Sequence, residues 1–146
     1  MTEENRKDLV RLQLDRADKF LGQADQMLEM DCLDLAANRY YYACFHAVQG
    51  LFIHDGLNSH SHRGMHQVLG MNYVVTGKFD SRLSGFLRTM EQLREKADYN
   101  CAYDVMKEEV EEIFYIEDEE LFEDDINQLI TDDDFSIEEN FLDDED

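Results

Sequence analysis

Residues 36–54 read AANRYYYACFHAVQGLFIH, and this stretch predicts the central helix of the fold. Its apolar side chains recur at steps of three and four residues, as on one face of a helix. A face of that width is buried against neighbouring helices. The apolar residues of this face and its flanks are Ala36, Ala37, Tyr40, Ala43, Cys44, Ala47, Val48, Leu51 and Phe52.

The other face of the same helix carries polar side chains of an unusual combination. Arg39 and His46 are seven residues apart, which places them within roughly 20° of each other around the helix and about 10 Å apart along it. Tyr42 and Gln49 fall near the same stripe. Arginine suits phosphate oxygens, and histidine both takes and gives a proton near neutral pH. Two interpretations stay open here: a functional site, or a hydrogen-bonded polar pair inside a bundle.

The segments on either side of this stretch are also periodic, and they predict an all-α, up-and-down bundle of four to five helices. The chain contains no proline, which favours helices over turn-rich β architecture. Asp31 or Asp34 is expected to cap the central helix, and Asp55-Gly56 to end it. The other expected helices are 4–30, 64–75, 81–99 and 105–130, with a loop over 100–104.

Three histidines lie just after the central helix. His60, His62 and His66 belong to the segment that contains NSHSHRGM, and the last two have the four-residue spacing of a metal chelate. No nearby Cys, Asp or Glu completes a ligand set, so no metal site is predicted. A simpler interpretation is that Ser59 or Ser61 caps the following helix.

Negative charge is concentrated at the C-terminal end of the chain. Residues 1–105 hold 12 Lys and Arg against 15 Asp and Glu, whereas residues 106–146 hold one lysine against 20 acids. We therefore expect a helical domain over 1–130 followed by an acidic tail over 131–146. Such a tail repels nucleic acid, so an RNA substrate must lie away from it, and no DNA partner is expected.

The cysteines and the hydropathy pattern exclude other classes of protein. Three cysteines without paired spacing predict neither a disulfide framework nor a zinc site. There is no long apolar run and no basic, then apolar, leader. We expect a soluble cytoplasmic protein with no membrane partner.

Three stretches together resemble the HEPN family of small helical bundles: AANRYYYACFHAV, GLNSHSHRGMHQVLGMNYVVTGKF and LREKADYN. Their order and spacing make the resemblance specific, and it covers roughly residues 9–103. It implies a helical bundle that is usually a homodimer. It also implies a frequent partner, a minimal nucleotidyltransferase, which acts as the antitoxin to a HEPN toxin.

The resemblance also implies a site. Many members are ribonucleases that need no metal or other cofactor, marked by an arginine, four to six residues, and a histidine. By this likeness His46 is the general acid or base on an RNA phosphodiester, and Arg39 holds the phosphate. The supporting residues implied are Asn38, Tyr42, Gln49, Arg94, Asp98 and Tyr99. The last three either border the cleft or, as we favour, lock their helix onto the central one. The alternative is a non-catalytic module that binds a nucleotide or a nucleotidyltransferase.

Overall fold

The computed structural model describes residues 1–99 and 104–114. Within these residues the fold is all-α, as predicted, and contains five α-helices and one short π-helix. The segments are α1 Glu3–Glu29, α2 Leu33–Asp55, α3 His62–Leu69, the π-helix η1 Gly70–Val74, α4 Ser81–Tyr99 and α5 Lys107–Phe114.

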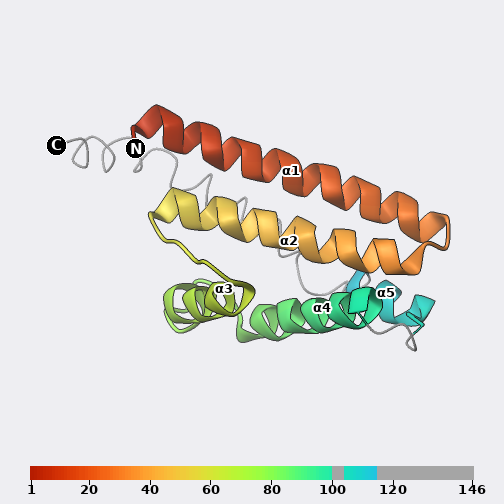
Figure 1. Ribbon diagram of the computed structural model, residues 1–146. Helices are drawn as coiled ribbons and strands as arrows, with labels where there is room; N and C mark the ends of the chain where they lie inside the picture. The colour runs from red at the N-terminus through yellow and green to blue at the C-terminus, as the bar shows by residue number, and fades with distance from the viewer. Residues whose placement is uncertain (100–103, 115–146) are drawn as a thin grey trace.

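The two longest helices, α1 and α2, form an antiparallel hairpin (Figure 1). Helix α1 begins where the Thr2 hydroxyl accepts a hydrogen bond from the Asn5 amide, at 3.1 Å. The hairpin turns at Asp31, whose φ of 57° is left-handed. The helices pack closely, since a Cβ at Gly50 would lie 3.4 Å from the Gln13 Cβ. This close approach places α1 side chains directly over the polar face of α2.

Helix α2 is the centre of the molecule, with α1 on one side and α3 and α4 on the other (Figure 1). It contributes Tyr41, Val48, Leu51 and Phe52 to the fully buried core. The other large core side chains come from the remaining elements: Met65, Leu69, Tyr73, Leu87, Met90 and Val110. The predicted apolar face of α2 is therefore buried except at Cys44, which is partly exposed, and Tyr41 joins the core from outside that predicted face.

Helix ends agree with the sequence in part. Gly56 ends α2 with a left-handed φ of 71°, and the Ser61 hydroxyl caps α3 by accepting from the Gly64 amide at 2.9 Å. The expected cap of α2 by Asp31 or Asp34 is wrong, because its N-cap residue is Cys32, which makes no side-chain cap bond. Asp31 lies in the turn, and Asp34 is already inside the helix.

The segment 64–75 is not one continuous α-helix. It begins at His62 as α3 and widens into the π-helix η1 at Gly70. Tyr73, in the wide turn, is fully buried and stacks on Phe52 at 6.1 Å and on Phe79 at 5.4 Å between ring centroids. Core packing of this one large ring accompanies the change in helix type.

Several expectations lie outside the described residues. These are most of the loop over 100–104, the helix expected beyond residue 114, and the division into 1–130 and 131–146. Among the helices that are described, none is both long enough and apolar enough to span a bilayer.

Candidate functional site

Arg39 and His46 share one face of α2, as their spacing predicts, and both contact Phe20 of α1. The Arg39 guanidinium lies 4.8 Å from the centroid of the Phe20 ring, and the His46 ring lies edge-on to it at 5.3 Å. Both side chains are partly exposed. The two residues are therefore arranged around one aromatic side chain and keep access to solvent.

A hydrogen bond from α1 fixes the tautomer of His46. Its Nδ1 lies 2.7 Å from the Gln13 Oε1, an oxygen that only accepts, so Nδ1 carries the proton. In the neutral ring the Nε2 then holds a lone pair. Burial, together with the nearby Arg16 charge, lowers the pKa of His46 below its ordinary 6.5. The imidazole is therefore neutral at pH 7 and basic at Nε2.

Asn38 connects Arg39 to α4. The Asn38 Oδ1 accepts from the Arg39 Nη1 at 3.0 Å, while its Nδ2 donates to the Asp98 Oδ2 at 3.2 Å. The same carboxylate oxygen lies 3.6 Å from the Nη1 of Arg94. A chain of four polar side chains thus runs from the candidate phosphate-binding arginine to the far helix.

Arg94 is the buried end of this chain, with only 5% of the residue exposed. Its guanidinium lies over three aromatic rings, those of Tyr41 at 5.1 Å, Tyr42 at 5.5 Å and Tyr99 at 5.9 Å. Charge and planarity suit this stacking. The contacts with Tyr41 and Tyr42 join α4 to α2, whereas Tyr99 lies on α4 itself. Arg94 and Asp98 are connected to Arg39 through Asn38.

The structure separates the other two predicted residues from the pair. Tyr42 packs edge-on against Phe45 and His62 and lies beneath Arg94. Gln49 donates to the Ser59 Oγ at 3.2 Å and lines a pocket at the end of α2. Within the residues that the structure describes, neither side chain makes a hydrogen bond or a ring contact with Arg39 or His46.

Sequence reasoning missed the contribution of α1. Gln13, Arg16 and Phe20 are spaced at three and four residues, so they share one helix face, and this face lies over the polar side of α2. In the sequence, the available signal is the charged Arg16 between Gln13 and Phe20 on one face of the first helix. This pattern points to the site only when the register of the hairpin of α1 and α2 is known.

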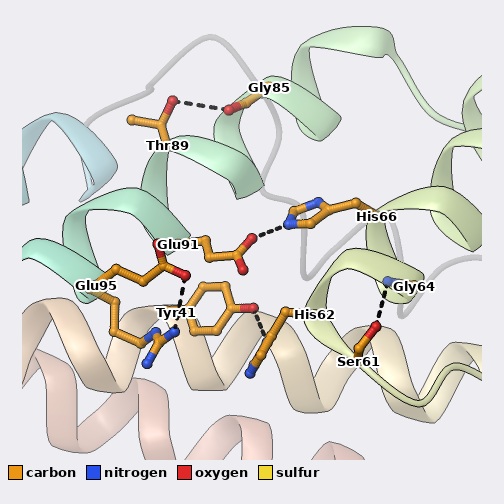
Figure 2. Close-up of polar contacts among 10 residues, drawn as sticks. Tyr41, Ser61, His62, Gly64, His66, Gly85, Thr89, Glu91 and Glu95 are labelled. Carbon is orange, nitrogen blue, oxygen red and sulfur yellow. Dashed lines mark hydrogen bonds and ion pairs between the residues drawn. The ribbon is translucent and has the colours of Figure 1, made fainter. Parts of the chain in front are cut away.

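His62 and His66 point to different partners, as Figure 2 shows. The Tyr41 hydroxyl lies 2.5 Å from Nδ1 of His62, and Nε2 of His66 is paired with the Glu91 carboxylate. Within residues 1–99 and 104–114, no group of three or more His, Cys, Asp or Glu is arranged to hold a metal ion.

Comparison with known proteins identifies the family of the chain. A protein of Thermotoga maritima named "UPF0332 protein" is 33% identical over 117 residues, which cover 80% of this chain and 87% of that protein. Two proteins of Methanocaldococcus jannaschii are similar. "Putative toxin MJ0605" is 30% identical over 78% of this chain and 83% of its own length, and "Putative toxin MJ0142" is 24% identical over 70% and 69%. The HEPN domain profile matches residues 10–122. The chain therefore belongs to the HEPN domain family.

Proposed function

We propose that this HEPN protein is a metal-independent endoribonuclease in which His46 and Arg39 act on an RNA phosphodiester. The observation that carries the proposal is the hydrogen bond from His46 Nδ1 to Gln13, because it leaves Nε2 as a base at neutral pH. Arg39 of α2 contacts the same Phe20 ring as His46, and the charge of Arg16 on α1 is near enough to lower the pKa of His46. A base near two guanidinium groups suits an anionic phosphodiester.

The proposed reaction is an internal transfer of the phosphoryl group. His46 Nε2 takes the proton of a ribose 2'-hydroxyl, and the 2' oxygen attacks the adjacent phosphorus. The bond from phosphorus to the 5' oxygen of the next nucleotide breaks, and the His46 imidazolium formed in the first step gives that oxygen its proton. The products are a 2',3'-cyclic phosphate and a free 5'-hydroxyl. Arg39 stabilises the negative charge that grows on the phosphoryl oxygens.

The reacting 2'-hydroxyl provides a direct test. Purified protein is incubated with an RNA oligonucleotide and with the same sequence carrying 2'-O-methyl groups at every position. The proposal predicts cleavage of the first, with cyclic phosphate ends, and none of the second. Cleavage of the methylated strand would exclude the 2' oxygen as the nucleophile.

The biological role that fits best is that of a toxin. Relatives in M. jannaschii carry toxin in their names, and the family resemblance adds a minimal nucleotidyltransferase as antitoxin and a homodimer as the usual assembly. In a symmetric dimer, two copies of α2 would line one cleft and share one RNA strand. Induced expression is expected to arrest growth, and His46→Ala is expected to relieve the arrest at equal protein level.

A non-catalytic binding module is the second candidate. The near balance of charges over residues 1–105 favours it, because a protein that grips RNA along its backbone usually carries a basic groove. This candidate predicts stable co-purification with a nucleotidyltransferase, or a retained nucleotide, while RNA incubated with the protein stays intact.

A further inference from the structure

A pocket with an aromatic wall lies beside the candidate catalytic histidine. It has a volume of about 210 Å³ and lies between the C-terminal half of α2 and the segment that leads into α3. Its lining residues are Phe45, Gln49, Ser59, His60, Ser61 and His62. The Phe45 ring connects the pocket to His46, since it lines the pocket and also lies edge-on to the His46 ring with 5.4 Å between ring centroids. A group held in the pocket would thus be one side chain away from His46.

The polar groups of the pocket include both donors and acceptors. The Gln49 amide nitrogen is used by Ser59, so the Gln49 carbonyl oxygen is left to accept and the Ser59 hydroxyl is left to donate. His62 lines the pocket as well. Its Nδ1 is hydrogen-bonded to the Tyr41 hydroxyl, and Figure 2 shows its other ring nitrogen directed away from Tyr41. That nitrogen donates or accepts according to the tautomer of the ring.

The lining residues of the pocket do not carry the positive charge that a phosphate group would need. None of the six lining residues is a lysine or an arginine. Burial and the nearby Arg94 lower the pKa of His62, which keeps its ring neutral at pH 7. An aromatic wall with neutral donors and acceptors is instead the chemistry that recognises an unstacked nucleobase in single-stranded RNA.

We propose that this pocket binds one nucleobase of a single-stranded RNA, stacked on Phe45 and hydrogen-bonded by Gln49 and Ser59. The proposal rests on the proposed function for its location, because it makes the pocket a base subsite next to the phosphodiester at His46. It assigns a role to the NSHSH segment that the catalytic pair does not use. Base recognition here would determine which phosphodiester of an RNA reaches His46.

The test measures binding alone, so it does not depend on cleavage. The probe is a fluorescently labelled hexanucleotide of mixed sequence with 2'-O-methyl groups, compared with a hexamer of the same backbone in which the bases are absent. Fluorescence anisotropy gives the Kd of each probe for the wild-type chain, Phe45→Leu, Gln49→Ala and the control Gln67→Ala. Gln67 is exposed on α3 and lies outside the pocket.

Phe45→Leu is expected to weaken binding of the base-bearing probe by about 5- to 150-fold, the range typical for one stacked base. Its effect on the abasic probe should be under about twofold, since that probe has nothing to stack. Gln49→Ala should act in the same direction and Gln67→Ala should not. Three results would each overturn the proposal: equal losses of affinity for both probes, unchanged Kd values in variants that melt like the wild type, or no binding of the base-bearing probe.

If the selective loss for the base-bearing probe is observed but the wild type cleaves no RNA, the base subsite stands and only the proposed ribonuclease activity is rejected.

Discussion

At the scale of single residues, two neighbours on α1 determine the tautomer and the charge of His46. Gln13 fixes which nitrogen is protonated, and Arg16 disfavours the imidazolium by its charge. Burial of the ring also lowers the pKa of His46, and its effect is larger than that of Arg16. The base is therefore tuned by a helix that does not itself carry the motif.

Replacing Arg16 is expected to move the acid limb of the pH–rate profile. Cleavage should rise with pH as His46 loses its proton, with an apparent pKa below 6.5 in the wild type. Arg16→Gln removes a cation that opposes protonation, so the pKa rises toward 6.5 and the limb shifts to higher pH. The pKa of His46 does not reach 6.5 in this variant, because the ring is still partly buried.

Arg11→Gln is the matched control for that measurement. Arg11 is also an exposed arginine of α1, but it lies 3.7 Å from Asp8 and is no cause of the shift at His46. Identical pH–rate profiles for Arg16→Gln and the wild type, with turnover retained, would remove Arg16 from this account.

The motif residues themselves could be predicted from sequence. The seven-residue spacing of Arg39 and His46 determines a shared helix face, and that face is observed. Their partners could not be predicted in the same way. Gln13 lies 33 residues from His46, and its position depends on the register of the hairpin, which the close packing at Gly50 helps to set.

At the scale of elements, the contact between α2 and α4 depends on one buried cation. Arg94→Ala is expected to lower the free energy of unfolding by about 2–3 kcal/mol, because it removes three aromatic contacts and leaves Asp98 without its charged partner. Thermal melting measures the loss. Arg88→Ala, at an exposed position of the same helix, should change stability by less than about 0.5 kcal/mol. Equal melting temperatures for the two variants would show that Arg94 does not lock the helices.

The junction of α2 and η1 should make stability depend on pH. Burial raises the pKa of Asp55, but hydrogen bonds from His54 and Tyr73 outweigh it, so the folded pKa lies below the ordinary 3.8. That stabilisation is complete above the unfolded pKa and is lost as the pH falls through the folded one. Tyr73→Phe is therefore expected to cost about 1 kcal/mol at pH 7 and less near pH 3.

Denaturant unfolding at the two pH values tests this expectation. Asn72→Ala is a control in the same π-helix, because its side chain donates to a backbone carbonyl, that of Val68, and to no carboxylate within the described residues. Its cost should be the same at both pH values. A loss for Tyr73→Phe that does not change with pH would mean that Asp55 is not its charged partner.

Helix ends and helix types differ in how well sequence predicts them. Ser61 and Gly56 act locally, through a side-chain cap and a left-handed φ, and both were predictable from residue type. The π-helix at Gly70 was not, and it coincides with the packing of Tyr73 between Phe52 and Phe79. Such packing joins residues from three separate segments.

At the scale of the whole molecule, charge should set how RNA approaches. Residues 131–146 contain nine acids and no lysine or arginine, and with a net charge of -22 the chain repels a polyanion. Replacing those nine acids by Asn and Gln in the full chain is expected to strengthen RNA binding at low salt. The gain should shrink as salt screens the charges. An affinity that is equal to that of the wild type at every salt concentration would mean that the tail does not influence RNA.

The most direct test of the central claim is cleavage of a mixed RNA pool in EDTA by the wild-type protein and by His46→Ala. Both must first melt at similar temperatures, which separates chemistry from folding. Cleavage by the wild type and none by the variant is expected, because Nε2 of His46 is proposed as the base in a reaction that needs no metal. Cleavage by both proteins would contradict the role of His46. Intact RNA in both samples would reject the ribonuclease and leave a HEPN module that binds without cutting.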